Sequence, residues 1–168
     1  ILAFVGASGV GKTTLMCELL KRMPERVFPI VILTNRTRRG PEDDIFCRFV
    51  DAEIIQQEKD FGNLVHYLEY GGNIYGCTKA DVARALERGV GVQAYTESGV
   101  QLLLAQGYNV VAVKVIADVE VYRDAKRIEE DKKRAETPVE YQMVLENSFA
   151  PGGLEKAAQK LMAFIETR

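Results

Sequence analysis

The chain has 168 residues, of which 47% are hydrophobic and 27% charged, and its net charge is −2. These values are typical of one globular domain with a full hydrophobic core, and they argue against a general nucleic-acid binder, whose binding surface would be basic. No apolar run approaches the ~20 residues of a membrane span. The three cysteines, Cys17, Cys47 and Cys77, fit neither a disulfide framework nor a zinc site. We therefore expect a cytoplasmic protein with reduced thiols that binds neither nucleic acid nor membrane.

Apolar runs alternate with helix-like segments along the chain, and Pro24 and Gly89 mark two helix ends. In chain order we expect strand Ile1–Val5, helix Lys12–Met23, strand Ile30–Leu33, a polar loop Asn35–Asp44, strand Phe46–Val50, helix Asp51–Lys59, strands Leu64–Tyr70 and Asn73–Tyr75, helix Ala80–Arg88, strand Val90–Tyr95, helix Gly99–Gln106, strand Tyr108–Ile116, helix Val119–Glu136, strand Tyr141–Leu145 and helix Leu154–Glu166.

The order of these elements predicts the fold class. Strands separated by helices are typical of an α/β fold, in which a parallel sheet is covered by helices on both faces. The strand-rich stretch 35–79 interrupts that alternation, so we interpret it as an inserted subdomain. No internal repeat is visible.

A glycine-rich motif directly follows the first strand and directly precedes the first helix. It has the pattern G-x-x-x-x-G-K-[ST], which is typical of a phosphate-binding loop in this context. Backbone N–H groups of such a loop and the helix N-terminus bind phosphate oxygens, the lysine reaches the β- and γ-phosphates, and the hydroxyl binds Mg²⁺. A glycine turn with a capping threonine is the simpler alternative. We predict that ATP phosphates bind Gly6, Ala7, Ser8, Gly9, Val10, Gly11, Lys12, Thr13 and Thr14, with Mg²⁺ at Thr13.

The glycine-rich motif and three further patches occur in the order and spacing of the guanylate kinase family, which the chain resembles over nearly its whole length. The first patch, Thr34–Glu42, reads TNRTRRGPE against the family's S/T-T-R-x-x-R followed by Gly and Glu. The second, Gly72–Thr78, reads GNIYGCT against G-N-x-Y-G-[ST]-[ST], and the third, Tyr141–Asn147, reads YQMVLEN against Y-D-Y-V-I-x-N.

The resemblance implies a three-layer P-loop kinase fold with a parallel sheet, an inserted subdomain that binds a nucleoside monophosphate, and a lid. It implies one domain over residues 1–168, with the core at 1–34 and 80–168, the subdomain at 35–79 and the lid at about 119–136.

The resemblance also assigns roles to individual residues. Arg36 and Arg39 correspond to the pair that binds the acceptor phosphate, as does the hydroxyl of Tyr75, and Thr34 lies beside them. A guanidinium suits this task because it binds a phosphate dianion bidentately. Lys12 and Arg127 correspond to the residues that stabilise charge on the transferred group.

Where the family reads guanine, this chain departs from the pattern. The family's Glu, Ser/Thr and Asp align with His66, Cys77 and Thr96, and its tyrosine near the start of the subdomain aligns with Cys47. A carboxylate accepts two N–H bonds from guanine, whereas a neutral imidazole accepts at most one. Each lost bond weakens guanine selection by about 1 kcal/mol. An alternative to a weakened guanine site is that register shifts bring in Glu69 and Glu97 to rebuild it. An alternative for His66 is that it is simply packed in its strand and contacts no base.

The lid region departs as well. With Arg127 as the second lid arginine, the stretch from Arg123 to Arg127 is about a dozen residues shorter than the family pattern, and the first lid arginine has no clear equivalent. A segment missing from the sequence would explain this equally well.

Three functions remain open at this stage. The first is ATP- and Mg²⁺-dependent phosphoryl transfer to a nucleoside monophosphate, with GMP as the leading acceptor. The second is the same transfer to a different phosphorylated acceptor, and the third is a guanylate kinase-like binding module without catalysis. The sequence does not indicate an oligomeric state.

Overall fold

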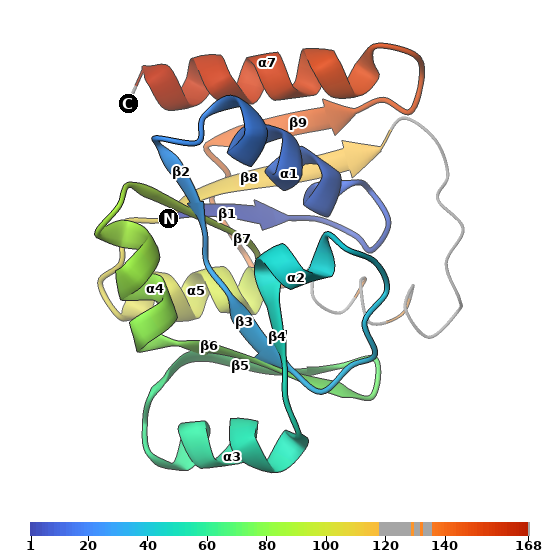
Figure 1. Cartoon of the computed structure of the whole chain (residues 1–168). Helices are drawn as coiled ribbons and strands as arrows, with labels where there is room; N and C mark the ends of the chain where they lie inside the picture. The colour runs from blue at the N-terminus through green and yellow to red at the C-terminus, as the bar shows by residue number, and fades with distance from the viewer. Residues whose placement is uncertain (118–128, 130–131, 133–135, 168) are drawn as a thin grey trace.

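The computed structural model describes residues 1–117, 129, 132 and 136–167, which form a three-layer α/β fold (Figure 1). Its larger sheet contains β1 (Leu2–Val5), β2 (Val27–Pro29), β7 (Val90–Ala94), β8 (Val111–Ala117) and β9 (Met143–Asn147). The strand order is β2-β7-β1-β8-β9, and every neighbouring pair is parallel. The predicted α/β class with a parallel sheet is therefore confirmed.

Side chains on alternate positions of β1 explain the layering. Leu2 and Phe4 pack into one core cluster with apolar residues of α1 (Lys12–Arg22) and α7 (Gly153–Glu166). Ala3 and Val5 point the other way and pack with α4 (Lys79–Leu86) and α5 (Glu97–Ala105). Because successive strand residues face opposite sides, an all-apolar strand needs helices on both faces. Figure 1 shows α1 and α7 on one side of the sheet and α4 and α5 on the other.

A second, smaller sheet comes from the segment between α1 and α4. It contains β3 (Ile32–Thr34), β4 (Cys47–Phe49), β5 (Leu64–Tyr70) and β6 (Asn73–Thr78), in the order β4-β3-β6-β5. Strands β3 and β4 are parallel, and β6 is antiparallel to β3 and β5. Helix α3 (Ala52–Asp60) packs on this sheet, and the short α2 (Asp43–Phe46) precedes β4.

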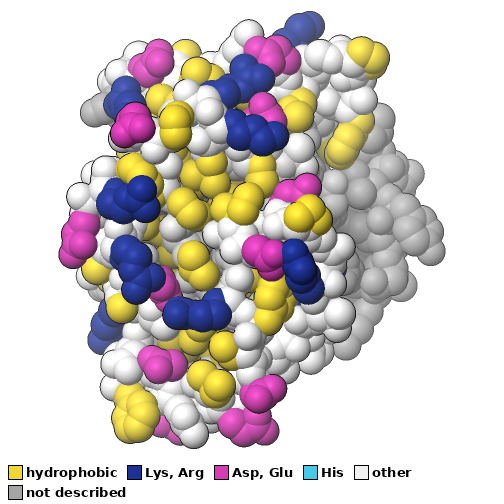
Figure 2. Space-filling model, in the orientation of Figure 1, with side chains coloured by type: hydrophobic (Ala, Val, Ile, Leu, Met, Phe, Trp, Pro, Cys, Tyr) yellow, Lys and Arg dark blue, Asp and Glu magenta, His cyan; other side chains and the backbone are white. Residues whose placement is uncertain are grey.

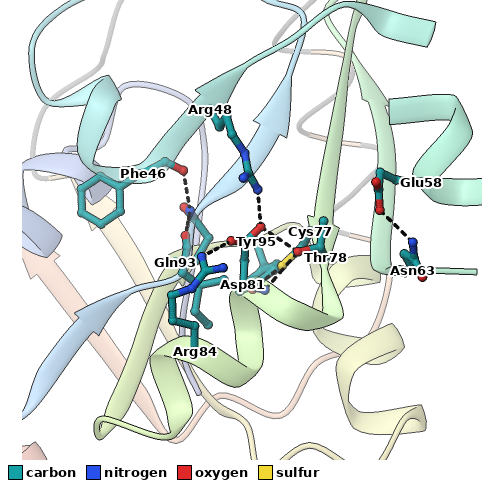
Figure 3. A network of polar contacts seen from close by, with 11 residues as sticks. Phe46, Arg48, Glu58, Asn63, Cys77, Thr78, Asp81, Arg84, Gln93 and Tyr95 are labelled. Atoms are coloured by element: carbon teal, nitrogen blue, oxygen red, sulfur yellow. Dashed lines mark hydrogen bonds and ion pairs between the residues drawn. The ribbon is translucent and has the colours of Figure 1, made fainter. Parts of the chain in front are cut away.

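Polar side chains join the two sheets, as Figure 3 shows. Gln93 of β7 donates from Nε2 to the carbonyl oxygens of Ile30 at 2.6 Å and Phe46 at 3.2 Å. The thiol of Cys77 lies 3.6 Å from the hydroxyl of Tyr95. Ile30 is fully buried where the chain passes from β2 to β3. These contacts hold the small sheet against the carboxyl ends of the large one.

Asp81, near the start of α4, forms the other network drawn in Figure 3. Its buried carboxylate accepts from Thr78 at 2.6 Å and from Arg48 and Arg84 at 2.7 Å each. A carboxylate at this position is stabilised by the helix N-terminus as well as by the two cations. The network fixes β4 and α4 to each other.

Several predicted strands differ in their bounds from those observed: the one expected at Tyr108–Ile116 begins at Val111, and the one expected at Asn73–Tyr75 continues to Thr78. Two further differences are explained by the neighbouring chain. Of the predicted strand Ile30–Leu33, only Ile32 and Leu33 lie in a strand, β3, and the strand β2, which was not predicted, ends just before it at Pro29. The predicted strand Tyr141–Leu145 begins two residues later, at Met143. Before it, Gln142 uses both its backbone N–H and its side-chain oxygen to bond Ala112, at 3.0 and 2.7 Å. The sequence pattern could not reveal either arrangement, because both depend on the neighbouring strand.

The predicted helix Val119–Glu136 and the lid at about 119–136 lie almost entirely outside the described residues. Among the residues that the structure does describe, no helix combines the length and the apolar composition needed to cross a membrane. On the face shown in Figure 2, basic and acidic side chains are interspersed, in keeping with the small net charge of −2.

Candidate active site

A cavity of about 580 Å³ lies between the loop after β1, the arginine-rich loop before β4, and strands β5, β6 and β7. At one end it is lined by residues predicted for ATP phosphates, namely Gly6, Ser8, Gly9, Gly11, Lys12, Thr13 and Thr14. At the other end it is lined by residues predicted for the acceptor, namely Arg36, Arg39, His66, Tyr75 and Thr96. The fold thus brings two sets of residues, distant in sequence, to one space.

The loop after β1 depends on glycine at two close approaches. Gly6 and Gly11 have φ angles of 146° and 89°, which only glycine adopts readily. A Cβ on Gly6 would lie 2.3 Å from the carbonyl oxygen of Val115, and one on Gly11 would lie 2.2 Å from Nδ2 of Asn147. Asn147 in turn donates to the carbonyl of Val10 at 2.9 Å. Strands β8 and β9 therefore fix the position of the loop through Val115 and Asn147.

Helix α1 begins directly at this loop. Gly11 is its N-cap and has no side chain with which to cap the first N–H groups. Uncapped N–H groups and the helix dipole favour an anion at this position. Lys12 donates from Nζ to the carbonyl oxygens of Gly6 and Ala7, each at 2.7 Å, so its ammonium lies over the loop. Ala7 and Val10 do not line the cavity, and their side chains pack with the core cluster of α1 and α7.

A magnesium ion would find few protein ligands here. The hydroxyl-bearing Thr13 lines the cavity, but the described residues contain no group of three His, Cys, Asp or Glu side chains that could hold a metal ion. Mg²⁺ commonly takes one or two protein ligands and completes its shell with water and phosphate oxygens. The donor set therefore fits a metal that arrives with a nucleotide.

The two arginines of the acceptor end have different environments. The side chain of Arg36 is 7% exposed and forms a bidentate pair with Asp43, with both N–O distances at 2.6 Å. The side chain of Arg39 is 61% exposed, and its guanidinium lies 3.5 Å from the same carboxylate. The hydrogen bonds from Arg36 hold the pKa of Asp43 well below its usual range. Arg38, between them, is exposed and pairs with Asp44 away from the cavity lining.

His66 lies in β5 at the wall of the cavity. It is 6% exposed, and burial lowers its pKa to about 4, so the imidazole is neutral at physiological pH. Its ring meets that of Tyr95 edge-on, with centroids 5.7 Å apart. Its Nε2 is buried and has no hydrogen-bond partner among the described residues. A neutral nitrogen here can donate or accept one hydrogen bond, depending on the tautomer.

Three other residues predicted for the acceptor make contacts within the fold. Thr96 lines the cavity, but its hydroxyl caps α5 by accepting from the N–H of Gly99 at 3.1 Å. Thr34 is fully buried and accepts from the N–H of Arg36 at 3.2 Å. Cys77 is also fully buried, and burial raises the pKa of its thiol to about 12. Neither Thr34 nor Cys77 reaches the cavity lining.

The two glutamates considered as replacements in a guanine site make other contacts. Glu69 accepts from the hydroxyl of Tyr67 at 2.8 Å, and Glu97 is buried, 3.5 Å from the hydroxyl of Tyr141. Neither lines the cavity. Arg127, the arginine predicted for the lid, lies outside the described residues, as does Arg123.

Some lining residues were not found from the sequence. Gln93 is a polar residue in an otherwise apolar strand, and that pattern could have indicated that it lines the cavity. Glu42 and Asp43 follow the arginines, but nothing in their spacing shows which arginine each would pair with.

Comparisons with known proteins agree on one family. The family model for guanylate kinase matches residues 1–168. The guanylate kinase of Myxococcus xanthus (strain DK1622) is 35% identical over 88 residues, which is 52% of this chain and 42% of that protein. The guanylate kinase of Desulfitobacterium hafniense (strain Y51) is 26% identical over 178 residues, covering 97% of this chain and 89% of that protein.

A solved structure extends the likeness to the fold. The crystal structure of guanylate kinase from Anaplasma phagocytophilum superposes with a TM-score of 0.68, at 16% identity, covering 99% of this chain and 84% of that one. At that identity the superposition supports the fold alone. Several of the more identical relatives, including that of M. xanthus, are matched over less than half of their own length.

Proposed function

The chain belongs to the guanylate kinase family, and we propose that it transfers the γ-phosphoryl group of ATP to a nucleoside monophosphate, with GMP as the first candidate acceptor. One observation carries the proposal. A single cavity is lined at one end by a glycine-rich phosphate loop and at the other by Arg39 and Tyr75. Such a space suits two phosphorylated ligands placed end to end.

The residues of the cavity suggest how each substrate would be held. The loop N–H groups, the N-terminus of α1 and Lys12 would bind the β- and γ-phosphates of ATP. The hydroxyl of Thr13 would bind Mg²⁺, which neutralises charge on those phosphates. Arg39 and the hydroxyl of Tyr75 would hold the acceptor phosphate. The acceptor oxygen is already ionised at neutral pH, so transfer needs positioning and charge stabilisation rather than a general base. Arg127 remains a proposed second cation for the transferred group.

The cavity wall around His66 bears on how well the protein distinguishes one nucleoside monophosphate from another. Among the described residues, the carboxylates that line the cavity are Glu42 and Asp43, and both belong to the arginine loop rather than to β5 or β7. The wall at β5 therefore offers a neutral imidazole and no carboxylate for a base edge. Phosphate contacts give affinity for any monophosphate, whereas base contacts give the difference between them. We therefore propose that the protein discriminates GMP from IMP or AMP only weakly.

A coupled assay of ADP release tests both proposals. ATP with GMP, IMP or AMP should give turnover with similar kcat/KM, and Lys12→Ala should give none. A preference for GMP of several-thousandfold would contradict weak discrimination and leave the kinase assignment intact. Binding of ATP and GMP without turnover for any acceptor would instead favour a binding module of this family.

A further inference from the structure

The guanidinium of Arg36 is already fully engaged at both terminal nitrogens. One of them donates to Asp43 at 2.6 Å and to the carbonyl of Thr37 at 3.0 Å. The other donates to Asp43 at 2.6 Å and lies 3.5 Å from the sulfur of Cys47. The guanidinium also lies 5.5 Å from the centre of the Phe49 ring. An incoming phosphate therefore cannot bind both terminal nitrogens of Arg36 while these contacts persist.

The carboxylate of Asp43 is held as firmly as the arginine. Its side chain is 8% exposed, and its Oδ2 also accepts from the backbone N–H of Arg39 at 2.7 Å. A guanidinium with a backbone N–H beside it is a set of donors that proteins use to bind a phosphate group, and here the two carboxylate oxygens of Asp43 accept from that set. Asp43 thus presents to Arg36 the same chemistry that an acceptor phosphate would present.

Arg39 differs from Arg36 in all these respects. Its side chain is 61% exposed, and among the described residues its guanidinium makes only the 3.5 Å contact with Asp43. A guanidinium in that state can bind a phosphate bidentately at little cost. Both arginines line the cavity, so an anion that reaches Arg39 is also close to the Arg36–Asp43 pair.

We propose that Asp43 is an internal competitor of the acceptor phosphate: the acceptor binds first to Arg39, and it gains Arg36 only by displacing the Asp43 carboxylate. The proposal rests on the proposed function in taking the anion to be a monophosphate. A phosphate dianion next to Asp43 is repelled by it, and removal of that negative charge both ends the repulsion and frees Arg36. Asp43 therefore lowers acceptor affinity and makes it depend on the rearrangement of one ion pair.

The test compares Asp43→Asn with Asp44→Asn. Both substitutions remove one negative charge from α2, but Asp44 pairs with the exposed Arg38 and does not line the cavity. Binding of GMP and of inorganic phosphate is measured by calorimetry without ATP. We expect Asp43→Asn to bind both about tenfold tighter than the wild type does, which matches one charge-assisted hydrogen bond regained. Asp44→Asn should change the affinity less than about twofold.

Weaker or unchanged binding by Asp43→Asn relative to Asp44→Asn would overturn the proposal and make Asp43 a residue that orients Arg36. If Asp43→Asn does not fold, a second measurement on the wild-type chain tests the proposal. Displacement of Asp43 breaks its bond with the N–H of Arg39, so the Arg39 amide resonance should move upfield as GMP is added. An unmoved resonance at saturating GMP would overturn the proposal as well.

The same measurements separate this inference from the proposed function. Calorimetry without ATP does not depend on phosphoryl transfer. Normal GMP binding without turnover would therefore refute the kinase and leave the competition intact. No binding of GMP or phosphate by any of the three proteins would refute both the acceptor site and the competition.

Discussion

Replacement of Gly11 by alanine tests how the phosphate loop is held. Gly11 has a φ of 89°, and a Cβ there would lie 2.2 Å from Nδ2 of Asn147. The left-handed backbone costs alanine about 1–2 kcal/mol. Asn147 must also leave the carbonyl of Val10, which it bonds at 2.9 Å, and that loss costs about 0.5–1.5 kcal/mol. We expect Gly11→Ala to lower the free energy of unfolding by about 1.5–3.5 kcal/mol, the sum of both effects.

The two contributions can be separated by a second glycine and a second variant. Gly107 has a φ of 83°, and a Cβ there would meet nothing within 4 Å, so Gly107→Ala carries the backbone cost alone. In an Asn147→Ala background the contact is absent, so Gly11→Ala should cost only about 1–2 kcal/mol. The measurement is urea unfolding of the four variants and the wild type. A Gly11→Ala cost below about 0.5 kcal/mol, or one undiminished by Asn147→Ala, would refute the reasoning.

Four further predictions concern residues that line the cavity. Lys12→Ala should abolish ATP-dependent transfer with little change in the unfolding midpoint, and normal turnover would show that the phosphate-loop assignment is wrong. Arg39→Ala should raise the KM for GMP about ten- to more than a hundredfold and leave that for ATP nearly unchanged, as checked by steady-state kinetics. Arg36→Ala should instead lower the free energy of unfolding by about 3 kcal/mol, the low end of the cost of breaking a buried ion pair, because the buried Asp43 keeps only the Arg39 N–H and the exposed Arg39 guanidinium 3.5 Å away. The pKa of His66 falls from 6.5 to about 4 on folding, so the stability linked to it is complete above pH 6.5 and is lost as the pH falls toward 4. The loss should reach about 3 kcal/mol at about 1.36 kcal/mol per pKa unit, and a His66→Phe variant with the same acid response in urea titrations would contradict it.

The position of the glycine-rich loop in the fold was predictable from the sequence. The glycines, the lysine and the threonine are close in sequence, and their geometry follows from local backbone rules, so the motif alone placed Gly6–Gly11 between β1 and α1 and Lys12–Thr14 in the first turn of α1. The alternation of strands and helices predicted the parallel sheet for a similar reason. A strand such as Leu2–Val5, apolar at every position, must be covered on both faces.

The acceptor end was less predictable because its properties come from tertiary contacts. Arg36 and Arg39 are equivalent in the sequence pattern, yet one is buried on Asp43 and the other is exposed. The hydroxyl of Thr96 is directed to the N-terminus of α5, and the thiol of the buried Cys77 lies against the hydroxyl of Tyr95. Pattern and spacing fix where a residue lies along a strand, but the partner that it meets depends on elements far away in the chain.

The most direct test of the account is whether one cavity holds both substrates. A ligand that joins adenosine and guanosine through five phosphates reaches both ends of such a cavity at once. In calorimetric titrations it should bind with one-to-one stoichiometry and at least about a hundredfold tighter than GMP alone, because the second contact becomes intramolecular. Lys12→Ala and Arg39→Ala should each weaken it. An affinity no better than that of ATP, or one weakened by only one of the two substitutions, would contradict a shared cavity for donor and acceptor.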